Sequence, residues 1–164
     1  MTTSRLIATW FGVGLLRPAP GTWGTLAALP FVWLAHILGG FLLVALATLA
    51  IFLVGWWASV VETRDSADPD PSEIVIDEVA GMFLALWPVS LGAQIAGVDV
   101  LALWPGWVAA FLAFRLFDIW KPGPVGWADR MHTPLGLMLD DIIAGLFAAA
   151  VVVLAAALAH GVLM

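Results

Sequence analysis

The chain has 164 residues, of which 63% are hydrophobic and only 11% are charged, and its mean hydropathy is +1.05. This composition excludes a water-soluble globular domain and is typical of an integral membrane protein. A formal net charge of −6 argues against a nucleic-acid partner, and the absence of cysteine from the sequence excludes disulfides, thiolate metal sites and a cysteine nucleophile.

The chain begins with a short apolar stretch, residues 6–16, that is too short to cross a bilayer. No small-residue cleavage site follows it, so we expect an N-terminal interfacial helix rather than a signal peptide. The Pro- and Gly-rich segment 17–25 comes next and contains Arg17, Thr22 and Thr25. Because free N–H groups at a helix start bind anions, these three residues are candidates for substrate binding. An ordinary turn leading into a helix is the alternative interpretation.

Apolar runs predict an all-helical class, a polytopic integral membrane bundle. A hydrocarbon core of about 30 Å requires roughly 20 apolar residues per helix. Four runs that are nearly free of charge approach this length: residues 41–61, 79–98 with a kink expected at Pro88, 100–117 and 142–164. The run 25–38 is shorter and either spans the membrane or re-enters it. We therefore expect about four to five transmembrane helices in a single domain, residues 1–164.

The basic residues predict the orientation of these helices, because Lys and Arg concentrate in cytoplasmic loops. If residues 25–38 cross, the segments 1–24, 61–78 and 118–141 share one side of the membrane. Those segments hold five basic residues: Arg5, Arg17, Arg64, Lys121 and Arg130. The N-terminus is then cytoplasmic and the C-terminus lies outside. Every carboxylate except Asp99 faces the cytoplasm in this topology.

Acidic residues stand where the predicted spans meet water. With residues 25–38 counted as the first span, Asp77 and Glu78 begin the third span and Asp118 ends the fourth. Asp140 and Asp141 begin the fifth. Any single pair has a simple structural explanation, because a carboxylate stabilises a helix N-terminus.

Two of these acidic pairs share a further pattern. Asp77 and Asp141 each begin the sequence Asp-x-x-Ala-Gly. Since a small residue one turn after the Asp allows close helix packing, we expect the two helices to meet at Gly81 and Gly145 and to bring their carboxylates together.

Clustered carboxylates repel one another unless a hard divalent cation such as Mg²⁺ lies between them. A proton relay or ion path is the alternative, but it would place acidic residues near the middle of the membrane. Arg115, Asp118 and Lys121 recur at a spacing of three and predict one ridge of the fourth span. Two cations that flank an acid are typical of a phosphate site with a metal, whereas snorkelling to the headgroups is the simpler interpretation of Lys121 alone.

Four stretches of the sequence resemble the phosphatidylglycerophosphatase A family. They are PGTWGT at 20–25, IVIDEVAG at 74–81, FRLFDIWKP at 114–122 and MLDDIIAG at 138–145. The resemblance extends from about Phe11 to Leu146. One departure lies at residues 133–136, which read Thr-Pro-Leu-Gly where the family pattern is Gly-Gly-x-Gly.

The resemblance implies a Mg²⁺-dependent enzyme of the bacterial inner membrane whose active site faces the cytoplasm. It would hydrolyse the phosphomonoester of phosphatidylglycerophosphate to phosphatidylglycerol and inorganic phosphate, with a membrane phospholipid as its partner and no obligate protein partner. The resemblance assigns metal-ligand roles to Asp77, Glu78, Asp118, Asp140 and Asp141, and catalytic roles to these residues without Asp140. Arg115 and Lys121 would bind the phosphate or headgroup, and Asp70 is a further substrate-binding candidate.

Two other functions are weighed against this one. A CDP-alcohol phosphotransferase also gathers Asp residues around Mg²⁺, but the Asp-Gly-x2-Ala-Arg opening of its motif is absent from the sequence. A small divalent-cation transporter would need acidic residues deep within the spans. Among phosphatase chemistries, metal-activated water fits the residues present, and the sequence leaves open which carboxylate acts as the base.

Overall fold

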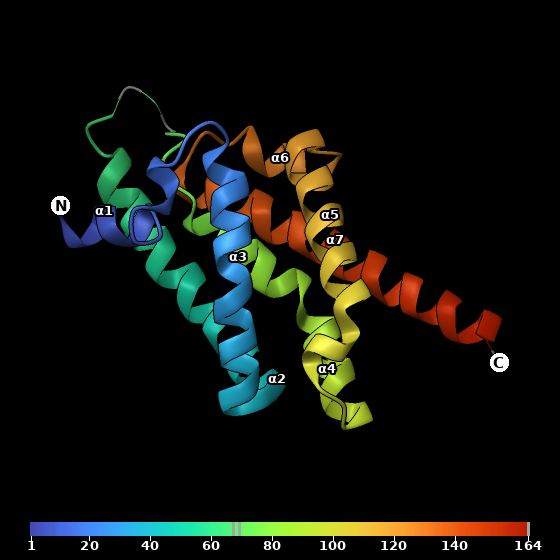
Figure 1. Cartoon of the computed structure of the whole chain (residues 1–164). Helices are drawn as coiled ribbons and strands as arrows, with labels where there is room; N and C mark the ends of the chain where they lie inside the picture. The colour runs from blue at the N-terminus through green and yellow to red at the C-terminus, as the bar shows by residue number, and fades with distance from the viewer. Residues whose placement is uncertain (67, 69, 164) are drawn as a thin grey trace.

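The computed structural model of the chain describes residues 1–66, 68 and 70–163, and every regular element in this part of the chain is a helix (Figure 1). The predicted all-helical class is therefore confirmed. Four stretches are long and apolar enough to cross a membrane: Pro20–Thr63, Ile76–Ala96, Val100–Trp120 and Pro134–Ala159.

The N-terminal segment forms a shorter helix than predicted. Helix α1 (Thr3–Ala8) ends at Ala8, and η1 (Val13–Leu15) is a single 3₁₀ turn. Between them, Trp10 and Phe11 have φ of 44° and 58°, and Gly12 has φ of 90°. Three consecutive left-handed residues cannot continue an α-helix, so the predicted continuous helix over 6–16 is wrong.

Helix α2 (Pro20–Thr63) is a hairpin of two limbs, because Gly39 and Gly40 leave the helical conformation. Figure 1 shows the limb 20–38 descending and the limb 41–63 returning. Gly40 has φ of 62°, and the Phe41 N–H next to it donates to Gln94 Oε1 at 2.8 Å. The first limb begins at Pro20, earlier than the predicted run, because proline suits the first position of a helix. It is about 28 Å long and so nearly matches the hydrocarbon core.

Helix α3 (Ile76–Ala85) occupies the centre of the bundle, and α4 (Trp87–Ala96) continues it after a break at Leu86. The break adjoins Pro88, where the sequence predicts a kink. Helix α3 is buried along almost its whole length, and it packs against α2, α5 (Trp104–Trp120) and α7 (Pro134–Leu163). The remaining elements are η2 (Val100–Leu103) and α6 (Pro124–Asp129).

Helix α7 begins earlier than the apolar run predicts. Thr133 Oγ1 accepts the Gly136 N–H at 3.0 Å, and Pro134 occupies the first position of the helix. Asp140 and Asp141 therefore lie about two turns inside α7, and the prediction that they open the helix is wrong.

The close packing predicted between the third and fifth spans is confirmed. A Cβ atom on Gly145 would lie 2.4 Å from the Gly81 carbonyl oxygen, and one on Gly81 would lie 2.6 Å from the Asp141 carbonyl oxygen. The absence of side chains at both glycines allows the backbones of α3 and α7 to touch.

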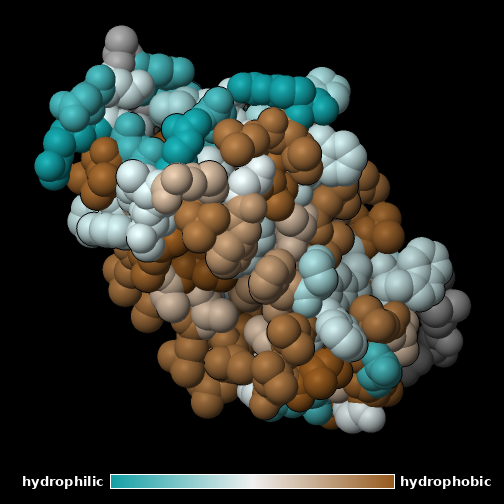
Figure 2. Space-filling model, turned by 60° about the vertical axis from the view of Figure 1, so that its left-hand side comes forward, coloured by the Kyte–Doolittle hydropathy of each residue, from teal (hydrophilic) through white to brown (hydrophobic). Residues whose placement is uncertain are grey.

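The fold gathers the polar segments at one end of a molecule that is otherwise apolar outside. The N-terminal segment, the loop before α3 and the segment around α6 lie together, whereas the turn at Gly39 and Gly40 lies at the opposite end (Figure 1). Figure 2 shows hydrophilic residues at this end and hydrophobic residues beneath them. Exposed Leu, Val and Trp side chains cover α2, α5 and α7, as expected of a membrane protein.

Candidate active site

A cavity of about 360 Å³ opens at the polar end of the bundle. Four elements and one loop meet there: the start of α2, the loop before α3, the first turn of α3, the end of α5 and the first turns of α7. Its charged lining residues are Asp70, Asp77, Glu78, Arg115, Asp118, Lys121, Asp140 and Asp141. The structure therefore brings together the acidic residues that the sequence singled out at three separate helix ends.

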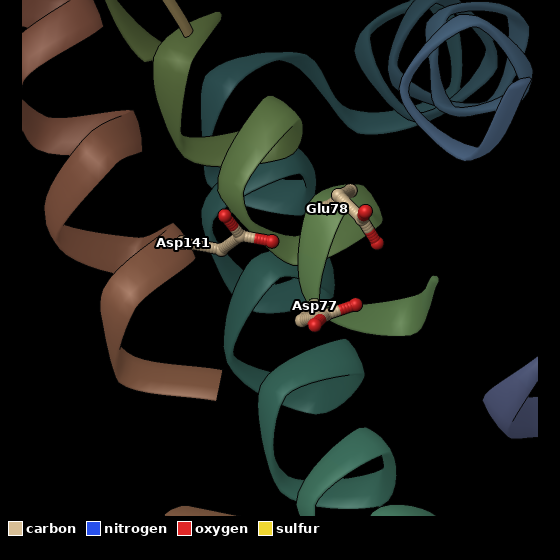
Figure 3. A group of neighbouring side chains, drawn as sticks. All are labelled: Asp77, Glu78 and Asp141. Carbon is tan, nitrogen blue, oxygen red and sulfur yellow. The ribbon is translucent and has the colours of Figure 1, made fainter. Parts of the chain in front are cut away.

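Three of these carboxylates form a cluster in which no member makes an ion pair with a described Lys or Arg. Figure 3 shows Asp141 pointing from α7 towards Asp77 and Glu78 on α3. One oxygen from each residue lies within 4.8 Å of the other two. Asp77 is 7% exposed and Asp141 is 3% exposed.

Each member of this cluster keeps one oxygen unsatisfied. Asp77 Oδ1, Glu78 Oε2 and Asp141 Oδ1 are buried and have no hydrogen-bond partner among the described residues. Burial of unpaired carboxylates is unfavourable, and a set of oxygen donors alone is the set that hard divalent cations prefer. The donor atoms thus fit a Mg²⁺ ion.

The other two predicted metal ligands are already paired with cations. Arg115 donates through Nη1 to Asp118 Oδ2, one turn further along α5. Lys121 donates to Asp140 Oδ2 at 2.7 Å and also to Asp129 Oδ1 on α6. The five carboxylates therefore divide into an unpaired cluster, Asp77, Glu78 and Asp141, and two ion-paired residues.

Lys121 does not continue the ridge of Arg115 and Asp118 as the spacing predicts. It is the C-cap of α5 and has φ of 51°, so its side chain leaves the helix direction and reaches α6 and α7. Burial alone would lower the pKa of Lys121, but the hydrogen bonds that it donates to Asp129 and Asp140 outweigh burial and raise the pKa above its ordinary value. The ammonium group is held charged beside the cavity.

Comparison with known proteins identifies the family of the chain. A family described as Phosphatidylglycerophosphatase A matches residues 6–156. The chain belongs to the phosphatidylglycerophosphatase A family. It is accordingly an enzyme of the phosphatase class, and the family match covers every residue that lines the cavity.

Individual relatives resemble the chain over most of its length. A Phosphatidylglycerophosphatase A of Haemophilus influenzae is 36% identical over 148 residues, which are 90% of this chain and 85% of that protein. A protein of the same name from Escherichia coli is also 36% identical, over 89% of this chain and 79% of its own. A Putative phosphatidylinositol-3-phosphatase of Bacteroides thetaiotaomicron is 34% identical, over 87% of this chain and 86% of that protein. No solved structure matches the chain.

In this member of the family, the substrate-binding candidates of the N-terminal segment lie outside the cavity lining. Arg17 donates to Ser72 Oγ at 3.1 Å and pairs with Glu73. Thr25 is buried, and its hydroxyl donates to the Gly21 carbonyl oxygen at 2.8 Å. Thr22 is half-buried and is likewise absent from the lining. Of the other substrate-binding candidates, Asp70, Arg115 and Lys121 do line the cavity.

Two residues of the site were not predicted from the sequence, Gly21 and Asp129. Gly21 lines the cavity, and a Cβ atom there would lie 2.2 Å from Glu78 Oε1 and 3.3 Å from Arg115 Nη1. It stands within the PGTWGT stretch, so a signal was present. No motif in the sequence points to Asp129, because its contact with Lys121 depends on how α6 lies in the fold.

Proposed function

We propose that the protein hydrolyses the phosphomonoester of phosphatidylglycerophosphate to phosphatidylglycerol and inorganic phosphate, with Mg²⁺ as its cofactor. The observation that carries the proposal is the cluster of three carboxylates, each with a buried oxygen that has no hydrogen-bond partner among the described residues, beside Arg115 and Lys121 in one cavity. The names of the Haemophilus and Escherichia relatives support the substrate. The name of the Bacteroides relative makes phosphatidylinositol 3-phosphate the competing substrate.

Asp77, Glu78 and Asp141 would hold the metal ion, because one oxygen of each lies within 4.8 Å of the other two and each residue keeps a buried oxygen without a hydrogen-bond partner among the described residues. Mg²⁺ supplies Lewis-acid stabilisation of charge on phosphoryl oxygens when it is bound beside a phosphate. Asp140 and Asp118 add negative charge to the same cavity, but their ion pairs make them supporting residues in this proposal.

The basic residues would bind the phosphate. The Nε of Arg115 has no hydrogen-bond partner among the described residues, whereas its Nη1 is fixed by Asp118. The guanidinium is thus oriented and still has a donor for a phosphoryl oxygen. Lys121 contributes a second positive charge, and Pro20 and Gly21 at the start of α2 line the cavity, where a helix N-terminus favours an anion.

Proton transfer to or from the attacking water and the leaving group requires a carboxylate within reach of the phosphate. Asp77, Glu78, Asp118 and Asp141 are the candidates, and all four line the cavity. The bundle suits a lipid substrate, because exposed Ile119 lines the cavity at the polar end and the surface beneath that end is largely hydrophobic (Figure 2).

Phosphate release by the purified protein in detergent tests this function. Phosphatidylglycerophosphate and phosphatidylinositol 3-phosphate are offered separately, with Mg²⁺ and with a chelator, to the wild type and to Asp141→Asn. Asp65→Asn is the control, because Asp65 is an exposed acidic residue outside the cavity lining. We expect Mg²⁺-dependent release from phosphatidylglycerophosphate that Asp141→Asn abolishes and Asp65→Asn preserves. Absence of release by the folded wild type would overturn the proposal.

A further inference from the structure

On three of its four sides, specific contacts link the segments that border the cavity. Between the start of α2 and the loop before α3, Arg17 binds Ser72 and Glu73. Between α7 and α5, Lys121 binds Asp140.

The third linked side lies between the loop before α3 and α7. Ile74 and Leu137 belong there to one buried apolar cluster, and each is 6% exposed.

The fourth side lies between the start of α2 and the end of α5. Both helices pack against α3, but over the described residues they form no extended interface with each other. Ala19 and Ile119 border this side, and both line the cavity while being exposed to the outside. The other exposed lining residues, Asp70 and Ser72, are polar and belong to the loop before α3, so the apolar part of the cavity edge lies on this side. Ile119 is 70% exposed. A side chain that faces both the cavity and the surroundings marks an edge of an opening.

The surface outside this opening is apolar. Below Ile119 on α5, Leu116 and Leu112 follow at spacings of three and four residues, and they are 56% and 60% exposed. These spacings place the three side chains in one stripe along the helix. The stripe leads from Ile119 at the cavity edge along α5 towards the middle of this membrane-spanning helix.

The opening lies at the level of the lipid headgroups. Trp23 on α2 and Trp120 on α5 are 42% and 70% exposed, and they stand near the ends of the two helices that border it. Exposed Trp residues concentrate at the interface between hydrocarbon and water. Within the opening, the guanidinium of Arg115 lies close to Gly21, where a lipid phosphate at this level would meet it.

We propose that the phosphorylated lipid enters the cavity sideways from the bilayer, through the opening between the start of α2 and the end of α5, with Ile119 at its edge and its acyl chains along the Ile119, Leu116 and Leu112 stripe. This proposal rests on the proposed function. The phosphate moves past Ile119 to Arg115 and the carboxylate cluster, while the acyl chains stay in the membrane. A water-soluble phosphomonoester has no need of this route, because the polar end of the molecule is open to water.

Site-directed labelling tests the route, and the natural lack of cysteine makes it direct. Ile119→Cys and, on the opposite edge, Ala19→Cys are each treated with a bulky maleimide. Trp120→Cys is the matched control, because Trp120 is as exposed as Ile119 and does not line the cavity. Each protein is assayed before and after labelling, with diacyl phosphatidylglycerophosphate in vesicles and with its deacylated, water-soluble headgroup.

We expect the label on Ile119→Cys or Ala19→Cys to slow hydrolysis of the diacyl substrate by about tenfold or more, and that of the soluble headgroup by less than about twofold. The label on Trp120→Cys should leave both rates unchanged. Equal rates on the diacyl substrate before and after labelling of Ile119→Cys would overturn the proposal. So would equal loss on both substrates, because Ile119 would then border the site without forming a lipid route. Failure of the proposed function is distinct: the unlabelled wild type would release phosphate from neither substrate.

Discussion

Replacement of Gly145 by alanine should separate the two helices that build the carboxylate cluster. The new Cβ would lie 2.4 Å from the Gly81 carbonyl oxygen, whereas ordinary contact begins near 3.4 Å. The obstacle is backbone, so α3 and α7 must move apart by about 1 Å because no side chain can rotate away. Overpacking of this kind costs about 1–3 kcal/mol.

The same displacement moves Asp141 away from Asp77 and Glu78, because α7 carries one part of the cluster and α3 the other. A misplacement of about 1 Å lowers catalytic rates by up to roughly a hundredfold. Thermal unfolding in detergent should show Tm lower by about 2–4 °C for each kcal/mol lost. Phosphate release should fall by at least tenfold or so, about 1.4 kcal/mol in transition-state stabilisation.

The matched control is Gly161→Ala on the same helix, where a Cβ atom would meet nothing within 4 Å. This variant should keep the wild-type activity. If Gly145→Ala had the same Tm and the same rate of phosphate release as the wild type, the reasoning would be refuted. The close approach of α3 and α7 would then not be what assembles the cluster.

Three further predictions concern the cavity. Gly21→Ala places a Cβ atom 2.2 Å from Glu78 Oε1, so the carboxylate must turn away, and the Mg²⁺ concentration for half-maximal activity should rise several-fold; an unchanged Mg²⁺ titration would contradict this. Asp129→Asn removes one of the groups that raise the pKa of Lys121, so this pKa should fall. Lys121 of the wild type stays charged throughout neutral and moderately alkaline pH, whereas Lys121 of the variant should lose its charge at a lower pH. The alkaline limb of a pH profile of phosphate release should therefore shift to lower pH in the variant. Arg115→Lys keeps the charge but loses the planar fork that binds an acid and a phosphate together, so kcat/KM should fall by about tenfold, and a change below twofold would show that Arg115 acts only through its charge.

Local chemistry explains which features of the fold could be predicted. The apolar runs predict the spans, the Gly39 and Gly40 pair marks the turn of α2, and Pro88 marks the break after α3. The Asp-x-x-Ala-Gly repeat predicts the contact of α3 and α7, because small residues one turn after the acid allow two membrane helices to approach closely. Helix boundaries were harder, since the start of α7 depends on a Thr133 cap in a loop that departs from the family pattern.

The sequence alone did not predict which of the carboxylates form ion pairs and which remain unpaired. Asp140 and Asp141 are neighbours in the chain, yet successive residues of a helix point about 100° apart. One therefore meets Lys121 and the other meets the α3 carboxylates. The choice depends on where Lys121 lies after α5 ends, and that position is fixed by Asp129 in a separate helix.

Metal binding by two neighbouring variants tests the central claim most directly. Titration of the detergent-purified protein with Mn²⁺, a paramagnetic substitute for Mg²⁺, reports affinity without reference to turnover. The account predicts that Asp141→Asn weakens binding by about tenfold or more, equivalent to roughly 1.4 kcal/mol. Asp140→Asn should bind the ion nearly as the wild type does, because Asp140 is paired with Lys121. A loss from Asp140→Asn equal to or greater than that from Asp141→Asn would contradict the assignment of the metal to Asp77, Glu78 and Asp141.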